Sequence, residues 1–404
     1  MNSRERVLAV FDHKVPDRLP LDFGGLADTG ISAAGYNRLK AAIGIQEERT
    51  RVLDLYMQSA KVGEMIRQRF HLDCALLHIE ANAYRPWTLR DGTQAEVPAG
   101  WQPIQQADGS HVVMGPGGKP LVKRLPDSYT FSPCGPLCPG LTREEDIPKY
   151  MPVVRIMDRP PYIDETLEEL AARAKSLCEN SNYAIVGYFG GHVYAAATYL
   201  RGIENFMCDL VERPTFCRAL MEAIADAHIR EFDHYIKALG PWIQIVQVAD
   251  DLGTQLGPQI SPAMFREIVR PPMERLYRHI RGRTDCRLVL HSCGSVYRFI
   301  PDLIEMGVQG LNPVQISAAQ MDPPTLKREF GKDIVFWGGG CDTQRVLPRG
   351  TPAEVAAEVR LRIDQLGKGG GMVFAQVHNI QPEVPPENII AMLDTAYEYG
   401  AKIY

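Results

Sequence analysis

The chain has 404 residues, of which 45% are hydrophobic and 23% charged, and its formal net charge is -5. This balance is typical of a globular protein with a large core, and the negative charge argues against nucleic-acid binding. Residues 1–8 hold no apolar run that could form a signal peptide or membrane span, and the nine cysteines are scattered, so we expect a cytoplasmic protein with reduced thiols and no membrane association.

Short apolar runs, each followed by helical periodicity, recur along the whole chain. In order they cover residues 18–25, 72–79, 183–189, 242–249, 287–291, 308–312, 333–337 and 372–377. Three intervening segments, 214–238, 262–281 and 352–366, carry apolar residues at three- and four-residue spacing, which predicts helices. Eight alternating strand and helix units predict a single domain over residues 1–404, a (β/α)₈ TIM barrel.

One segment, residues 84–132, interrupts the alternation after the second strand. Turn signals at 90–92, 107–109 and 115–118 separate short runs in it, which predicts inserted β-hairpins. At that position the insertion would lie over the barrel mouth as a lid or docking surface, or it would pack there without a role in chemistry. Its aromatic residues Tyr84, Trp87 and Trp101 either line a pocket for an aromatic ether or hold the insertion against the barrel.

Polar residues follow five consecutive strands in the second half of the chain. They are Asp250 and Asp251, then His291 and Cys293, then Asn312 and Gln315, then Cys341 and Asp342, and finally His378 and Asn379. TIM-barrel enzymes place their catalytic groups at the carboxyl ends of the strands. The pattern therefore predicts a site at the barrel mouth, although each residue alone also has a structural interpretation, such as helix capping by Asp250.

Three of these residues, His291, Cys293 and Cys341, indicate a zinc site with an open position. A neutral imidazole and two thiolates suit Zn²⁺, and three protein ligands leave a fourth place for substrate or water. Cys293 and Cys341 each follow a strand in a glycine-containing turn, so neither is needed to fill an apolar layer. Other cysteines, including Cys134 and Cys138, are interpreted as packing or loop residues.

Several motifs resemble the uroporphyrinogen decarboxylase superfamily and, within it, the zinc-dependent methyltransferases that work with corrinoid proteins. The motifs lie at residues 4–8, 16–20, 249–253, 260–262, 291–294, 311–315, 337–344, 378–382 and 385–389. The resemblance implies a TIM barrel in which His291, Cys293 and Cys341 hold zinc. It also implies a partner protein that carries the corrinoid (cobalamin), because this chain has no Asp-x-His-x-x-Gly motif. A homodimer is common in this superfamily.

Two departures from the family patterns narrow the expected chemistry. The decarboxylases use arginines near the first strand to bind substrate carboxylates, whereas residues 21–25 here contain none. Decarboxylation of uroporphyrinogen is therefore not expected. Some related methyltransferases have a glutamate as a further zinc ligand about twenty residues after the His-x-Cys, and this chain has Gln315 in that vicinity.

The predicted function is transfer of a methyl group between a small methylated ether, amine or thioether, or a thiol, and the corrinoid cobalt of the partner. We expect Asp250, Asp251 and His378 to act as catalytic groups that handle protons or orient the zinc-bound group, and Asn312 and Gln315 to position substrate. Two alternatives stay open: a metal-free decarboxylase or lyase of the same superfamily, and a zinc-stabilised scaffold without activity. The methyl donor and the direction of transfer are not fixed by the sequence.

Overall fold

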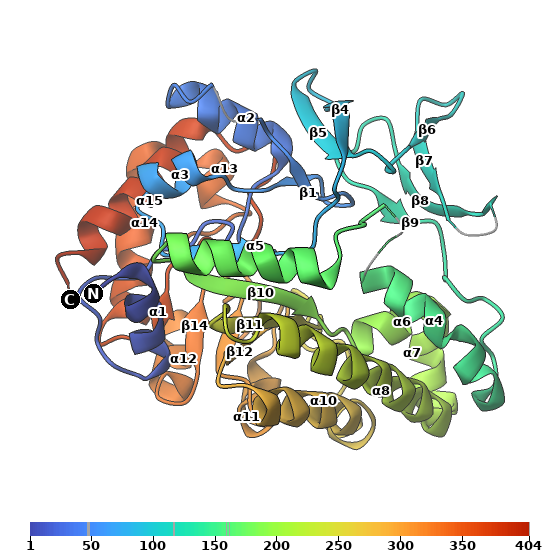
Figure 1. The fold of residues 1–404 in the computed structure, drawn as a ribbon. Coiled ribbons are helices and arrows are strands. Elements are labelled where there is room, and N and C mark those ends of the chain that lie inside the picture. The colour runs from blue at the N-terminus through green and yellow to red at the C-terminus, as the bar shows by residue number, and fades with distance from the viewer. Residues whose placement is uncertain (47–48, 116–117, 159, 161, 404) are drawn as a thin grey trace.

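The computed structural model describes residues 1–46, 49–115, 118–158, 160 and 162–403. Its largest sheet has seven parallel strands in the order β15-β14-β13-β12-β11-β10-β3 (Figure 1). Their bounds are β3 Cys74–Leu77, β10 Ala184–Gly190, β11 Ile245–Ala249, β12 Arg287–His291, β13 Gly310–Asn312, β14 Val335–Trp337 and β15 Met372–Val373. These strands confirm seven of the eight predicted runs.

A short segment around Leu21 closes the sheet into a barrel. Leu21 forms a parallel bridge with Phe374, just beyond β15, and its carbonyl oxygen accepts a hydrogen bond from the amide of Asp73, just before β3, at 2.8 Å. The strand predicted over 18–25 is thus confirmed only around Leu21. The chain turns away at Gly24, whose φ of +75° and close approach to Val62 require a glycine.

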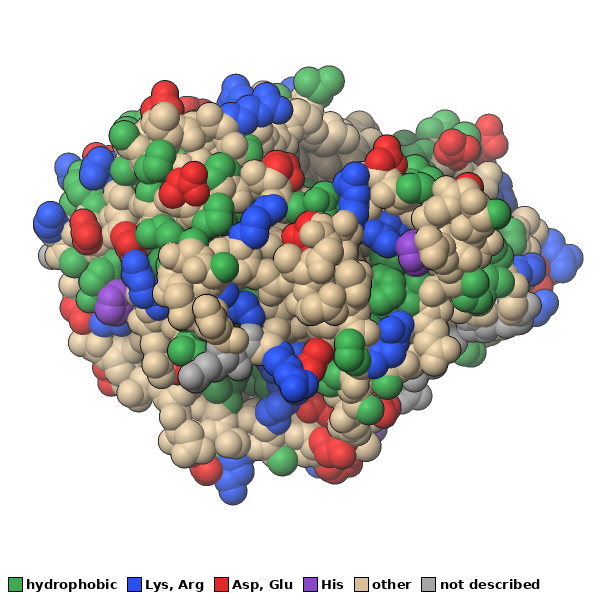
Figure 2. Space-filling view, turned by 90° about the horizontal axis from the view of Figure 1, so that it is seen from above, with side chains coloured by type: hydrophobic (Ala, Val, Ile, Leu, Met, Phe, Trp, Pro, Cys, Tyr) green, Lys and Arg blue, Asp and Glu red, His purple; other side chains and the backbone are tan. Residues whose placement is uncertain are grey.

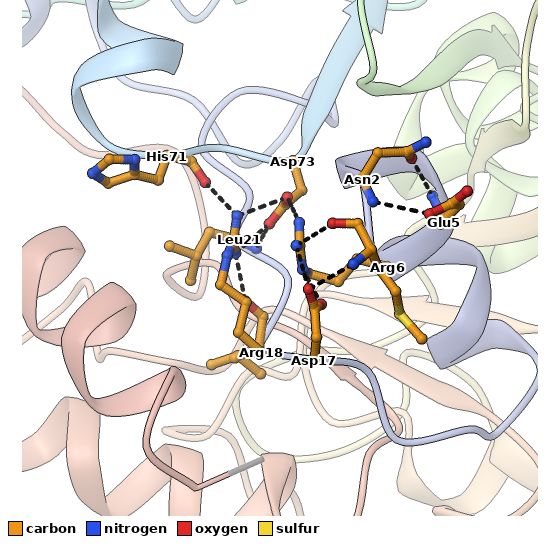
Figure 3. Close-up of polar contacts among 10 residues, drawn as sticks. Asn2, Glu5, Arg6, Asp17, Arg18, Leu21, His71 and Asp73 are labelled. Atoms are coloured by element: carbon orange, nitrogen blue, oxygen red, sulfur yellow. Dashed lines mark hydrogen bonds and ion pairs between the residues drawn. The ribbon is translucent and has the colours of Figure 1, made fainter.

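Two arginines from the amino-terminal motifs hold this closing segment in place. The carboxylate of Asp73 is fully buried and receives hydrogen bonds from Arg6 Nη1 at 2.7 Å, from Arg18 Nη1 at 2.7 Å and from the Leu21 amide at 2.8 Å (Figure 3). Arg6 also binds Asp17. The motifs at 4–8 and 16–20 therefore stabilise the closed barrel. Their arginines neutralise a buried carboxylate that would be strongly destabilising without a cationic partner.

The first helix, α1 (Ser3–Phe11), covers the amino-terminal end of the barrel. Val7, Val10 and Phe11 pack with the residues inside the barrel, and the Phe11 ring lies 6.1 Å from that of Trp337. The amide of Arg4 donates to the carbonyl of Asn182, two residues before β10. With this end closed by α1, the carboxyl ends of the strands form the accessible mouth.

The remaining helices surround the barrel (Figure 1). They are α2 Ala33–Ala42, α3 Glu64–Arg69, α4 Ile147–Asp158, α5 Leu167–Asn180, α6 Tyr194–Arg201, α7 Ile203–Glu212, α8 Pro214–Leu239, α9 Pro262–Met264, α10 Arg270–Arg283, α11 Ile300–Glu305, α12 Pro323–Phe330, α13 Val346–Arg349, α14 Pro352–Arg362 and α15 Pro386–Gly400. The three predicted helices are confirmed, two of them with a π-helical turn at Phe265–Val269 or Ile363–Gly367. Among the described residues, no helix is long and apolar enough to cross a membrane.

The segment after β3 forms antiparallel hairpins beside the barrel (Figure 1). The strands are β4 Tyr84–Thr88 and β5 Gln94–Pro98 in one sheet, and β6 Ile104–Gln105, β7 His111–Met114, β8 Pro120–Arg124 and β9 Ser132–Pro133 in another. A further small pair, β1 Val52–Asp54 and β2 Ser59–Ala60, has no counterpart among the predicted strands. Residues 116 and 117 of the turn predicted at 115–118 lie outside the described residues.

The aromatic residues of the insertion differ in their surroundings. Trp101 is fully buried, and its ring lies 5.3 Å from that of Phe131 and 5.2 Å from that of Tyr162. Trp87 donates its Nε1 proton to Gln58 at 3.1 Å. Trp101 therefore packs the insertion together. A lid function for residues 84–132 stays a prediction.

Candidate active site

Three side chains that the sequence placed at the mouth lie together as a possible metal site. They are His291 at the end of β12, Cys293 two residues later, and His378 in the loop after β15, and one ligand atom from each lies within 4.8 Å of the others. The Cys293 Sγ is 3.4 Å from His291 Nε2. All strands of the parallel barrel end at the same rim, so residues 87 positions apart meet here although β13 and β14 lie between β12 and β15.

His291 is oriented by acceptors on its Nδ1 atom. The Oδ1 of Asn312, at the end of β13, lies 2.7 Å away, and the Oδ2 of Asp28 lies 3.3 Å away. Asn312 is itself held, because its Nδ2 donates to the Trp337 carbonyl at 3.0 Å. Two oxygen acceptors hold a proton on Nδ1, so Nε2, which faces Cys293, is the nitrogen that a metal would use. Burial lowers the pKa of His291, but the charges of Asp28 and Cys293 raise it more, so its pKa lies well above the ordinary value and metal binding at Nε2 would release a proton.

The second histidine has the opposite hydrogen-bond pattern. The Nδ1 of His378 accepts the backbone amide of Asn379 at 2.7 Å, so the neutral ring carries its proton on Nε2. Burial lowers the pKa of His378, but a hydrogen bond to Cys293 raises it more, so its pKa lies above the ordinary value. In this arrangement His378 is a proton donor toward the sulfur. Binding a metal through Nε2 requires the proton on Nδ1 and loss of the Asn379 contact.

The turn that carries Cys293 is held by two neighbouring loops. The Oδ1 of Asp251 accepts the Cys293 amide at 2.8 Å, and the Oε1 of Gln315 accepts the Gly294 amide at 2.7 Å. Gly294 has φ of +86°, and a Cβ there would lie 2.4 Å from the backbone of Gly253, so no other residue fits. Burial raises the pKa of the Cys293 thiol, but His291 and His378 lower it more, so its pKa falls below the usual value.

The third predicted zinc ligand, Cys341, lies apart from this group. Its side chain is fully buried, and its Sγ lies 3.5 Å from Oε2 of Glu358 on α14. Burial holds the pKa of this thiol well above the usual value. Its backbone is close to the cluster, because its carbonyl oxygen accepts the amide of Val377, the residue before His378, at 3.1 Å. Zinc binding by Cys341 stays a prediction.

The two aspartates predicted as catalytic groups occupy different positions. Asp250 is buried and accepts the amides of Val193 and Ala195 at 2.8 and 2.7 Å, which caps the start of α6. Burial raises the pKa of Asp250 to about 6. The side chain of Asp251 is 54% exposed, and its Oδ1 lies 3.8 Å from His291 Nε2. Asp251 therefore faces the cluster, whereas Asp250 serves a neighbouring helix, and catalysis by either stays a prediction.

Asp28 is a site residue that the sequence argument missed. It follows the first strand, and its Oδ2 accepts a hydrogen bond from Gln247 Nε2 at 2.9 Å as well as lying near His291. Gln247 also accepts the amide of Ala27 at 3.0 Å, so the loop after the first strand is tied to β11. Asp28 shows the same sequence pattern as the other site residues, namely a polar residue after a predicted strand.

A cavity of about 510 Å³ opens beside Asp251. It runs along α6 and the start of α7 to the loop at 133–136. Its wall includes Pro133, Pro136, Tyr194, Tyr199, Ile203, Glu204, Asp251 and Gln259. Among the described residues that line it there is no lysine or arginine. The cavity is thus suited to a small ligand of mixed polarity and not to a polyanion.

Comparison with known proteins decides the family. The family model described as Uroporphyrinogen decarboxylase (URO-D) matches residues 135–399. The chain belongs to the uroporphyrinogen decarboxylase family. The matched range includes the whole of the His291, Cys293 and His378 cluster, whereas the inserted hairpins lie before it.

Some relatives within the family are named as decarboxylases, and one is named as a methyltransferase. A uroporphyrinogen decarboxylase from Methylococcus capsulatus is 24% identical over 52% of this chain and 59% of its own length. The methylcobamide:CoM methyltransferase MtaA from Methanosarcina barkeri is 23% identical over 54% of this chain and 59% of its own length. The chain thus spans about three fifths of the length of these relatives.

Among solved structures, a methyltransferase from Methanosarcina mazei has the same overall fold. The TM-score is 0.62, the sequences are 17% identical, and the match covers 99% of both chains. This likeness concerns the fold, and it agrees with the TIM barrel predicted from the alternating strands and helices.

Proposed function

We propose that the protein is a zinc-dependent methyltransferase that moves a methyl group between a small methylated substrate or a thiol and the corrinoid cobalt of a separate protein. The observation that carries the proposal is the cluster at the mouth, where Cys293 Sγ lies 3.4 Å from His291 Nε2 and both belong with His378 to one group. The methylcobamide:CoM methyltransferase among the relatives and the absence of cations in the described cavity wall support it.

The donor atoms in the cluster fit zinc. Zn²⁺ is bound by imidazole nitrogen and thiolate sulfur, and His291 is already oriented by Asn312 with its Nε2 directed toward Cys293. Cys293, with its lowered pKa, is the thiol most readily converted to a thiolate ligand. For the third ligand the geometry favours His378, whereas the sequence pattern favours Cys341. Either choice leaves a position for the substrate.

The residues around the substrate have separate roles in the proposed reaction. When bound, zinc would act as a Lewis acid on the heteroatom that loses or gains the methyl group, or it would stabilise a thiol acceptor as thiolate. Asp251 holds the Cys293 turn and is positioned to orient the group that reacts. A His378 that is not a ligand would keep its Nε2 proton and supply it to the departing heteroatom.

The mouth also fits the docking of a corrinoid protein. Three apolar side chains are exposed beside the cavity or on the loop after β11: Tyr199 at 49%, Ile203 at 59% and Leu256 at 87%. Exposed apolar groups next to a binding cavity are typical of an interaction surface. We propose that the partner covers this rim and presents its corrinoid above the cluster.

The proposal is tested by methyl transfer with free corrinoid. Zinc-loaded protein is mixed with cob(I)alamin and a panel of methyl ethers, methylamines and thioethers, or with methylcobalamin and thiols, and the cobalamin absorbance is followed. Transfer with at least one substrate is expected, reduced at least about 100-fold in Cys293→Ser, which lacks the thiolate donor. Cys208→Ser, which changes an exposed cysteine on α7, serves as the matched control. Zinc-loaded wild type that transfers no methyl group in either direction would refute the proposal.

The alternative of a metal-free decarboxylase has one observation in its favour, the names of relatives such as that from Methylococcus capsulatus. Against it, residues 21–25 at the first strand contain no arginine, and the described cavity wall has no cation for substrate carboxylates. Carbon dioxide release from a porphyrinogen by metal-free protein would favour it. The scaffold alternative instead predicts unfolding upon chelation and no exchangeable zinc position.

A further inference from the structure

Within the part of the chain that the structure describes, one arginine of the insertion is buried without an acidic partner. This residue, Arg124 at the end of β8, is 9% exposed, and no described residue forms a hydrogen bond with its Nε. Its Nη2 lies 3.1 Å from Nδ1 of His111, and the side chain packs over the Phe131 ring at 5.6 Å. Neither contact supplies a negative charge. Buried charges in proteins are normally paired, because an unpaired one costs several kcal/mol of desolvation.

A second arginine faces the same place. Arg90, in the turn between β4 and β5, stacks over the Tyr129 ring at 4.8 Å, and among the described residues it makes no ion pair. Arg90 and Arg124 line one small depression together with Tyr129, Gln58, Ser32 and Pro382. The proximity of the two guanidinium groups lowers the pKa of Arg124, after the larger effect of burial. Two cations are therefore held near each other, and neither forms an ion pair with a described residue.

The start of helix α2 forms the other wall of this depression. Ser32 is the N-cap residue of this ten-residue helix, and its Oγ accepts the amide of Gly35. A helix amino terminus carries a partial positive charge that favours anions. On the face of the molecule seen in Figure 2, Lys and Arg side chains are interspersed with Asp, Glu and hydrophobic ones. Two guanidinium groups and the start of α2 thus line one depression. Because the Ala33 and Gly35 amides already have partners, the helix contributes through its dipole.

We propose that this depression, defined by Arg90, Arg124 and the amino terminus of α2, binds the carboxylate or phosphate group of a small ligand. The enclosed space, about 10 Å³, is enough for one oxygen atom, which fits a terminal oxygen of such a group. Arginine presents its donors in a planar fork that matches both anions. Gln58 also lines the wall, but its side-chain amide is already engaged by Leu55 and Trp87, so the two arginines are the donors to the anion.

The proposed site is connected to the candidate active site through the backbone. The amide of Ser32 donates to the carbonyl of Ile380 at 2.8 Å, and the amide of Gly30 donates to Oδ1 of Asn379 at 2.6 Å. Both acceptors lie in the loop that carries His378. An anion bound beside Ser32 would therefore lie next to the loop that carries His378, because Pro382 of that loop also lines the depression.

Isothermal titration with inorganic phosphate and with succinate, at constant ionic strength set by chloride, tests the proposal on the full chain. One site per chain is expected for at least one of the two anions, and the preferred anion identifies the group. Arg124→Gln and Arg90→Gln should each weaken that binding about tenfold or more, because each removes charge-assisted hydrogen bonds. Because Arg90 is exposed, its variant is expected to fold even where Arg124→Gln does not.

Arg49→Gln is the matched control. Arg49 is 83% exposed, pairs with Glu96 and does not line the depression, so its removal should leave anion binding unchanged. Binding that falls equally in the Arg49 and Arg90 variants would mean a general effect of charge and would overturn the proposal. Absence of binding for both anions in the wild type would overturn it as well.

Discussion

The side-chain oxygen of Asn312 lies 2.7 Å from Nδ1 of His291, so the end of β13 fixes the ring at the end of β12. Replacement by leucine keeps the approximate size but removes this acceptor. We expect Asn312→Leu to weaken zinc binding about 10- to 100-fold, the usual effect of losing such an outer partner. Competition with a chromophoric chelator measures it. Ser317→Ala, a change at a partly exposed residue in the following loop, should have no effect, and an unchanged affinity in Asn312→Leu would contradict this role.

Among the carboxylates of the amino-terminal network, Asp73 is the one whose loss should destabilise the barrel most, because it is buried and binds two arginines. Asp73→Ala would leave Arg6 and Arg18 without their shared partner (Figure 3). We expect the free energy of unfolding to fall by about 3 to 5 kcal/mol, measured by urea denaturation. Asp394→Ala breaks the partly exposed pair with Arg69 and should cost less than about 1 kcal/mol. Similar losses in both variants would refute the role assigned to the buried pair.

Asp22 should give the stability a measurable pH dependence. Burial raises the pKa of this carboxyl from 3.8 to about 6, although Thr29 and Trp337 donate hydrogen bonds to it. The folded state then binds more protons than the unfolded state between these values. The contribution of Asp22 to stability is therefore fully present below about pH 4 and is lost as the pH rises through about 6.

The corresponding variant is Asp22→Asn, which cannot ionise. Between pH 4 and pH 7 the wild type should lose up to about 3 kcal/mol relative to the variant, which follows from the two pKa values. Thermal or urea unfolding across this range measures the difference. Parallel pH profiles for the two proteins would show that the Asp22 pKa is not raised.

The strands and the mouth could be predicted from the sequence because both follow from local patterns. Apolar runs predict parallel strands, and their polar ends predict His291, Cys293 and His378 at one edge. The direction of each side chain could not be predicted in this way. Cys341 faces Glu358 on an outer helix, and Asp250 caps α6, which begins 56 residues before it. Such contacts depend on packing between strands and helices far apart in the chain.

In the inserted hairpins, too, local sequence patterns predict the turns but not the long-range packing. The turn residues of the insertion predicted hairpins, yet the partners of its aromatic side chains depended on long-range packing. Trp101 packs against Phe131 and Tyr162, which lie 30 and 61 residues later in the chain. Asp28 lies seven residues beyond the paired Leu21, and it reaches His291 only because Gln247 holds the intervening loop against β11, a long-range contact that no local pattern predicts.

The most direct test of the account is the zinc content per chain of purified wild type, Cys293→Ser, His378→Ala and Cys341→Ser, each shown to be folded. We predict about one zinc in the wild type, markedly less in Cys293→Ser, and a larger loss in His378→Ala than in Cys341→Ser, because His378 shares the cluster. The reverse order for the last two would make Cys341 the third ligand. Wild type without zinc, after growth with zinc supplied, would contradict the metal centre and the proposed methyl transfer together.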